Sequence, residues 1–322
     1  MSLERPSRPV RSSDLEAGLA RAVAGAPSPV IGLFGPDNPI WQVQREALVF
    51  LGAGRAMLLQ TAHPWVAQGV LRQSRALRDP IGRFHRTFTM MFSMVYGSTD
   101  QACARARQLH RIHSAIAGPM DETVGPFVAG SPYRANDVDA LLWVHATLWD
   151  SSVRMHEAVM GPMDPAFREA YYAQTRRFAG LFGIPDEAVP QDWGAFQDYV
   201  EDMLSSDILS IGTAGHTIGQ ALMAGRGASW WPGTPYWFRC LTAESLPLRL
   251  REGFGLAFGP REEARAALAW RRIHRLYPRL PQRLRQVPVY REALGRIEGR
   301  RGPDPLTRLL NLAWIGRTSL VP

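Results

Sequence analysis

The chain has 322 residues, of which 46% are hydrophobic and 20% charged. These values are ordinary for globular proteins and exclude a disordered or fibrous chain. All 37 basic residues are arginine and outnumber the 29 acidic ones, which gives a formal net charge of +8. Because the arginines are spread along the chain and no recognisable binding module accompanies them, we expect no binding to nucleic acid.

The cysteines and the N-terminal region indicate the cellular compartment that we expect for the protein. The two cysteines, Cys103 and Cys240, lack the spacing of a disulfide framework or a redox motif. Residues 1–30 are rich in Arg, Pro and Ser and contain no secretion signal, so we interpret them as a mobile leader before a single domain over 31–322. No apolar run approaches the ~20 residues of a membrane span. We expect a cytoplasmic protein, and a peripheral contact with a membrane stays open.

Helical periodicity dominates the chain and predicts an all-α fold without a convincing strand. The first predicted helix runs from Trp41 to Ala62, where apolar residues recur every three to four positions, and it ends before Pro64. Further helices are predicted at 65–75, 80–96, 100–117, 137–160, 164–182, 191–208, 260–277, 289–299 and 304–314. Gly225–Pro235 contains two tryptophans and predicts an irregular loop suited to a lid or an entrance.

A glycine pair near the first helix imitates a dinucleotide-binding turn. Gly52 and Gly54 have the right spacing, but Met57 stands where the third glycine belongs, and no alternation of strands and helices surrounds them. We interpret the pair as small residues that let helices, or a flat cofactor, approach closely. The sequence also lacks the His-Glu-x-x-His and Glu-x-x-His spacings of zinc hydrolases and di-iron bundles.

His110 and His113 lie on the predicted helix 100–117. Residues 109, 112, 113 and 116 share one face of that helix and are otherwise apolar, so we expect His113 to point inward and His110 to lie nearer the edge. A neutral imidazole that projects into an apolar cavity is the geometry of a haem axial ligand. A core histidine bonded to a backbone carbonyl fits the same pattern, so both interpretations stay open here.

The segment that opens the predicted helix 80–96 carries a second group of polar residues. Arg83 and Thr87 share one helix face at four-residue spacing, directly after Asp79. An arginine and a hydroxyl on one face could bind carboxylates of a cofactor or bound oxygen. Alternatively, Arg83 is a solvated partner of Asp79 and Thr87 bonds back to its own helix.

Six short segments in register carry a resemblance to a known family. They are Gln60-Thr-Ala-His63-Pro64, then Asp79-Pro80-x-Gly82-Arg83-x-x-Arg86-Thr87, a turn at Gly97, His113-x-x-x-x-Gly118, Tyr133-x-Ala135-x-Asp137, and Trp143-Val144-His145-Ala146-Thr147-Leu148. Their order and spacing over about residues 40–200 resemble the catalytic domain of the rubber oxygenase and MpaB-type family.

The resemblance implies an all-helical domain that encloses a noncovalently bound haem b, with His113 as the axial ligand of the iron. It places Arg83 and Thr87 near the haem in cofactor-binding and catalytic roles. Arg86 stands where rubber-cleaving members have a lysine able to approach the distal face, so it joins the catalytic candidates. His145 also matches a family position, and we interpret it as a residue that supports the cofactor pocket or the packing around it.

The activity implied by the resemblance is that of a haem-dependent oxygenase. It uses O2 to cleave or oxygenate a carbon–carbon double bond in a small hydrophobic substrate, olefinic or isoprenoid in character. Arg86 in place of lysine and the missing secretion signal argue against rubber itself as the substrate. Two alternatives remain, a haem-binding sensor or carrier without turnover, and a helical structural or membrane-surface protein without haem.

Overall fold

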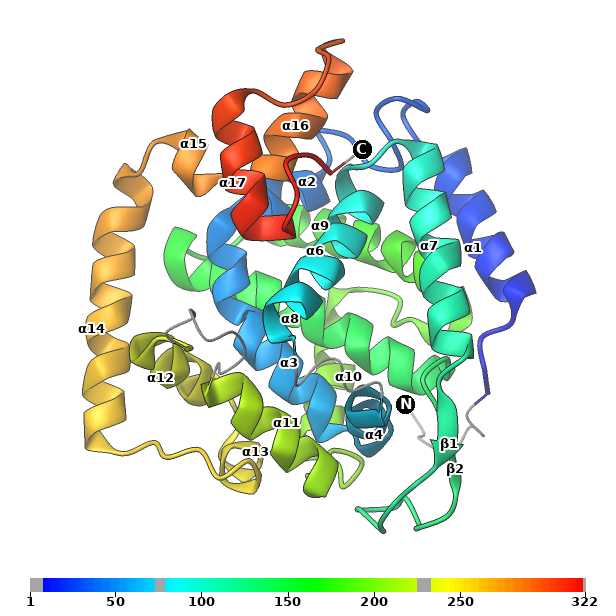
Figure 1. The fold of residues 1–322 in the computed structure, drawn as a ribbon, viewed down its shortest axis with the longest axis vertical. Coiled ribbons are helices and arrows are strands. Elements are labelled where there is room, and N and C mark those ends of the chain that lie inside the picture. Colours follow the sequence, from blue (N-terminus) through cyan, green and yellow to red (C-terminus); the bar gives the residue numbers. More distant parts are fainter. Residues whose placement is uncertain (1–7, 73–78, 225–232, 321–322) are drawn as a thin grey trace.

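The computed structural model describes residues 8–72, 79–224 and 233–320. The fold is all-helical apart from one two-stranded ribbon, which confirms the predicted fold class (Figure 1). The helices are α1 (Ser12–Ala24), α2 (Pro39–Gln44), α3 (Ala53–Ala62), α4 (Pro64–Arg72), α6 (Pro80–Tyr96), α7 (Thr99–Ser114), α8 (Val138–Met160), α9 (Pro165–Ala179), α10 (Trp193–Ser205), α11 (Thr213–Ala224), α12 (Tyr236–Glu244), α13 (Leu248–Gly253), α14 (Pro260–Leu276), α15 (Gln282–Arg285), α16 (Pro288–Ile297) and α17 (Pro305–Ile315).

Short elements connect several of these helices. Four 3-10 helices occupy Ala47–Gly52 (η1), Gly180–Phe182, Asp186–Ala188 and Tyr277–Arg279 (η4) in the described chain. Strand β1 (Ala117–Pro119) pairs antiparallel with β2 (Pro132–Arg134). Within the described ranges, no helix is both long enough and apolar enough to cross a bilayer.

Capping side chains determine where several helices begin. Ser98 accepts a hydrogen bond from the Gln101 amide and opens α7 after the turn at Gly97. Asp137 accepts from the amides of Asp139 and Ala140 at the start of α8. Because such caps are local, the predicted helices from residue 80 onward agree with the structure within about three residues at each end.

The prediction of one continuous helix from Trp41 to Ala62 is wrong. The chain leaves the helical path at Glu46, whose backbone is extended, so that α2, η1 and α3 are separate elements. The buried Glu46 carboxylate accepts a hydrogen bond from the Tyr277 hydroxyl at 2.8 Å. A tertiary bond to a residue more than 200 positions away therefore overrides a favourable local helix pattern.

The predicted leader over residues 1–30 includes a packed helix. Leu15 and Leu19 of α1 are buried against the core, and Gly18 lies against the backbone of Gly180. This part of the chain belongs to the folded domain. Helix α11 was also missed, because Gly215 and Gly219 lower its helix propensity while letting it pack closely on its neighbours. Most of the predicted lid, Gly225–Pro235, lies outside the described residues.

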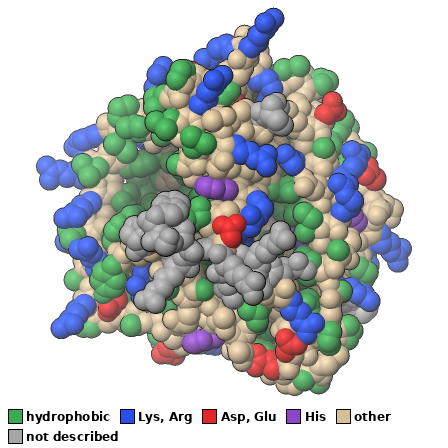
Figure 2. All heavy atoms as spheres, in the orientation of Figure 1, with side chains coloured by type: hydrophobic (Ala, Val, Ile, Leu, Met, Phe, Trp, Pro, Cys, Tyr) green, Lys and Arg blue, Asp and Glu red, His purple; other side chains and the backbone are tan. Residues whose placement is uncertain are grey.

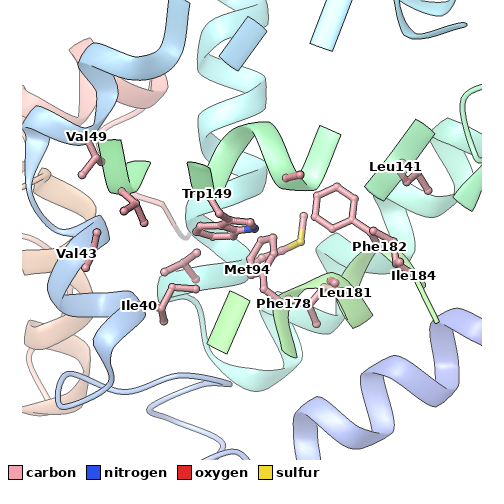
Figure 3. Packing of buried hydrophobic residues seen from close by; sticks show 14 of the residues in the cluster. Ile40, Val43, Val49, Met94, Leu141, Trp149, Phe178, Leu181, Phe182 and Ile184 are labelled. Carbon is pink, nitrogen blue, oxygen red and sulfur yellow. The ribbon is translucent and has the colours of Figure 1, made fainter. Parts of the chain in front are cut away.

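Helix α8 runs through the centre of the molecule and organises the core. Its Trp149 packs edge-on against Phe178 of α9, and Met94 of α6 lies beside them (Figure 3). The Trp143 indole donates to the Leu59 carbonyl at 2.8 Å, which ties α8 to α3. On the other side of α3, a Cβ added at Gly54 would lie 2.4 Å from the Thr242 hydroxyl, so the glycine pair serves helix contact.

A buried ion pair joins α3 to α8. The Arg55 guanidinium lies 2.6 Å from the Asp150 carboxylate, with both side chains almost fully buried. Arg55 also donates to the Ser151 hydroxyl at 2.9 Å and to the Ser245 carbonyl at 3.0 Å. Burial lowers the pKa of Arg55, and Asp150 counteracts that effect.

We predict that Asp150→Asn lowers the free energy of unfolding by about 3–5 kcal/mol, because it leaves a buried guanidinium without its counter-charge. Urea denaturation monitored by circular dichroism measures the loss. The matched control is Arg154→Ala, which removes an exposed partner of the same carboxylate and is expected to cost at most about 1 kcal/mol. Equal losses in the two variants would contradict the assigned importance of the buried pair.

Candidate functional site

Helices α6 and α7 meet at the turn at Gly97 and spread apart toward the N-terminus of α6 (Figure 1). Met94, Met90 and Thr87 share one face of α6, because they are spaced by four and three residues. Exposure rises along this face, from the fully buried Met94 through the half-buried Met90 to the exposed Thr87. The inward face of α6 therefore becomes accessible where the two helices separate.

The facing side of α7 shows the same trend. Ala102 and Ala106 are fully buried, whereas Leu109 and His113, further along the same face, are half-buried. The two helices thus bring His113 and the pair Arg83 and Thr87 to the ends that spread apart. The prediction that residues 109, 112, 113 and 116 share one inward face is wrong in one detail. Ile112 is 45% exposed and lies off that face.

His113 has the properties of a metal-ligating imidazole. Burial lowers its pKa to about 4, with a smaller contribution from the neighbouring His110, so the ring is neutral at physiological pH. Among the described residues, no hydrogen bond engages either ring nitrogen of His113. His110 turns the other way, since its Nε2 atom lies 3.5 Å from the Ser12 hydroxyl of α1. His113 is therefore the histidine of this pair that is free to bind a ligand.

Arg83 is a desolvated cation near the opening. Burial lowers its pKa, and the positive charge of Arg86 adds to the effect. In the described chain Arg83 forms no ion pair, because Asp79 bonds instead to Arg86 at 3.1 Å and to the Gly82 amide at 2.8 Å. The alternative in which Arg83 answers Asp79 is therefore wrong. A half-buried guanidinium that forms no ion pair with the described residues is suited to an anionic ligand group such as a carboxylate.

Thr87 and Arg86 occupy different surroundings. The Thr87 side chain is exposed on the face that leads inward, and none of the hydrogen bonds within the described ranges uses its hydroxyl. The back-bond to the helix expected for a threonine is made instead by Thr89, which donates to the His85 carbonyl at 2.7 Å. Arg86 is exposed and paired with Asp79, so the structure does not place it on the same face as Thr87.

Two residues each on α3 and α8 are more accessible than the central position of these helices would suggest. Met57 and Gln60 on α3, and Val144 and Leu148 on α8, are half-buried although both helices lie in the interior. The Gln60 amide donates to the Thr147 hydroxyl at 3.1 Å and links the two helices there. Periodicity alone could not find these positions, because a helix that is apolar on most sides predicts burial on all of them.

His145 lies within the packed core. It is 1% exposed, its Nδ1 atom accepts from the Trp149 indole at 3.0 Å, and its ring stacks near Phe178 of α9. Burial lowers its pKa to about 3. These contacts suit a residue that supports the packing behind the site, and direct cofactor binding by His145 stays a prediction.

His63 is buried at the C-terminal end of α3. It packs against Phe127 with ring centroids 5.2 Å apart, and burial lowers its pKa to about 4. These contacts suit a neutral histidine that packs in the interior at the end of α3.

The donor set fits a haem. Among the described residues it combines one neutral imidazole, one half-buried cation that forms no ion pair and one hydroxyl that forms no hydrogen bond, on two helices that spread apart. A haem needs an axial nitrogen, a cation for its propionates and apolar walls for its ring. His113, Arg83 and Thr87 supply the polar part of this set.

Comparison with known families matches residues 40–279 to a family described as ER-bound oxygenase mpaB/B′/Rubber oxygenase, catalytic domain. The chain belongs to this family. The matched region contains His113, Arg83, Arg86, Thr87 and His145, and membership supports an oxygenase role for the chain.

Two mycobacterial proteins are similar to part of the chain. The uncharacterized protein Mb2261 of Mycobacterium bovis and the uncharacterized protein Rv2237 of Mycobacterium tuberculosis are each 28% identical to it over 151 residues, which is 44% of this chain and 55% of each relative. The chain therefore spans about half the length of the curated relatives that it matches. No solved structure matches the chain.

The buried histidines predict a pH dependence of stability. His63 and His145 protonate in the folded chain only at about pH 4 and 3, whereas unfolded histidines do so near pH 6.5. The unfolded state therefore binds more protons below about pH 6.5, and the free energy of unfolding falls as the pH drops toward 4. We expect His63→Gln and His145→Gln each to flatten this dependence by up to roughly 1.4 kcal/mol per pH unit, measured by urea denaturation from pH 7 to 4. An unchanged slope in both variants would contradict the burial of neutral rings.

Proposed function

We propose that this chain is a haem b-dependent oxygenase that acts on a hydrophobic, olefinic or isoprenoid substrate. The observation that carries the proposal is the neutral, unengaged His113 on the inward face of α7, opposite Arg83 and Thr87, where α6 and α7 spread apart. Membership of an oxygenase catalytic-domain family supports the reaction class. The haem, when bound, would supply the binding and activation of dioxygen.

Each residue has a role that follows from its surroundings. His113 offers a ring nitrogen to the iron without first losing a proton, because burial keeps the ring neutral. Arg83 holds the anionic edge of the cofactor through charge-assisted hydrogen bonds. The Thr87 hydroxyl can donate one hydrogen bond toward a polar group in the pocket.

The apolar lining would bind the substrate and exclude water. Met57, Val144 and Leu148 present hydrocarbon and thioether surface to the interior, which favours an apolar chain over a polar one. Arg86 is held by Asp79 at 3.1 Å on the outer side of α6, so we assign it to the rim of the site. Arg86 would become available to a bound cofactor or substrate only if this ion pair opened.

We predict that the protein expressed with a haem supply shows a Soret absorption band, and that His113→Ala abolishes or strongly shifts the band. The control is His110→Ala, which removes a histidine from the same helix on the side facing α1 and is expected to keep the band. The absence of a Soret band in the parent protein would contradict the proposal of a haem-dependent oxygenase. A band unchanged in His113→Ala would move the ligand role to another histidine.

We predict that Arg83→Met weakens haem binding by roughly 10- to 100-fold, because it removes charge-assisted hydrogen bonds worth about 1.5–3 kcal/mol. Titration of the haem-free protein with haem measures the affinity. Arg86→Met removes the same charge from the exposed partner of Asp79 and is expected to change the affinity by less than about threefold. The reverse order of effects would show that Arg86 and not Arg83 holds the propionates.

The oxygenase step is tested with isoprenoid olefins of increasing length under ¹⁸O2. We expect carbonyl or oxygenated products that carry the label and that are absent from His113→Ala. A haem protein that binds but yields no labelled product from any olefin would be a sensor or carrier, the alternative activity.

A further inference from the structure

The segment 260–286, which comprises α14, η4 and α15, carries charge of one sign over most of its length, and we call it the basic arm. From residue 264 to residue 286 the arm contains seven arginines and no aspartate or glutamate. One of them, Arg285, pairs with Glu46. The other six take part in none of the ion pairs found within the described ranges, so the arm carries an excess of positive charge.

The same arm exposes leucines at four-residue intervals. Leu276, Leu280 and Leu284 are 56%, 39% and 55% exposed, respectively. Beside them lies an apolar groove of about 380 Å³ between the arm and η1, with Leu48 and Leu51 on its inner wall and Arg265 and Arg272 at its edge. Figure 2 shows this hollow in green next to the basic side chains along the edge that α14 forms in Figure 1.

The arm is fixed to the body of the protein, so its exposed leucines belong to the folded structure. The Tyr277 hydroxyl donates to the buried Glu46 carboxylate at 2.8 Å, and Gln286 forms a backbone bridge with Glu46. The Val287 amide donates to the Arg45 carbonyl at 2.8 Å directly after the arm. Both ends of the exposed stretch are therefore anchored on the loop that precedes η1.

We propose that the basic arm docks the protein on the surface of an anionic lipid bilayer. The leucines would enter the boundary between headgroups and acyl chains, and the flanking arginines would meet the lipid phosphates. The combination selects this partner, because nucleic acid would match the arginines but leave the leucines in water. Charge complementarity and the exposed apolar row thus point to the same occupant.

Side-chain packing links the docking surface to α6, the helix that carries Arg83 and Thr87. Phe50, next to Leu51 of the groove wall, packs against Phe88 of α6 with ring centroids 5.0 Å apart, and Phe88 follows Thr87. If the proposed function holds, the substrate is drawn from the membrane and reaches the site along this wall. Binding to the bilayer itself does not depend on haem.

Vesicle sedimentation tests the proposal with the purified full chain. Vesicles of phosphatidylcholine alone are compared with vesicles that contain about one-third phosphatidylglycerol, at low and at about 1 M salt. We expect binding to the anionic vesicles that weakens in high salt, and little binding to phosphatidylcholine. Arg272→Gln with Arg275→Gln is expected to weaken it roughly 25-fold, since each surface arginine contributes about a factor of five.

Two controls and a second variant decide the result. The pair Arg111→Gln and Arg134→Gln removes equal charge from α7 and β2, at the other edge of the molecule (Figure 1), and is expected to leave binding within about twofold. Leu280→Ser with Leu284→Ser is expected to weaken it tenfold or more, whereas Val128→Ser, at a 60% exposed position in the β1–β2 loop, is not.

The proposal is overturned if the parent protein does not bind anionic vesicles. It is also overturned if the two double arginine substitutions weaken binding equally, because that result would indicate attraction by net charge alone. Equal binding to a DNA duplex that survives the leucine substitutions would also overturn it. None of these readouts uses haem or turnover, so failure here and failure of the oxygenase assignment are separate results.

Discussion

The buried Arg55–Asp150 ion pair is the constraint on which the rest of the architecture depends. It fixes α3 against α8, and through the Ser245 carbonyl it also holds the end of α12. Two buried charges tolerate little sliding, because a shift of one helical turn would leave each without its partner. In this register Gln60 of α3 donates to the Thr147 hydroxyl of α8 at 3.1 Å.

The outer half of the site depends on a different feature, the divergence of α6 and α7 (Figure 1). The Gly97 turn holds these helices together at one end, while Asp79 caps α6 at the other and takes Arg86 as its partner. That arrangement leaves Arg83 without an ion pair among the described residues. Two arginines of one helical turn therefore differ in their surroundings. Arg86 is paired at the rim, and Arg83 is the one that could bind an anionic ligand group.

The fold class and most helix positions could be predicted from the sequence, because caps, breakers and helical spacing are local properties. The roles of the residues on α6 and α7 stay predictions. The sequence did not predict the break at Glu46, which is made by Tyr277 far along the chain. Nor did it predict the accessible stripe of α3 and α8, since an apolar side chain looks the same in sequence whether it lines a cavity or fills a core. Helix α11 was not predicted, because its two glycines have low helix propensity. Their close packing against neighbouring residues stabilises the helix in the folded chain.

The central claim is that His113 binds the iron of a haem held between α6 and α7. Chemical rescue tests it most directly, with His113→Gly supplied with haem and then titrated with free imidazole. The account predicts that the variant lacks the parent spectrum and that imidazole restores it, because the small ligand occupies the space left by the ring. A parent-like spectrum without imidazole, or none with it, would contradict the assignment.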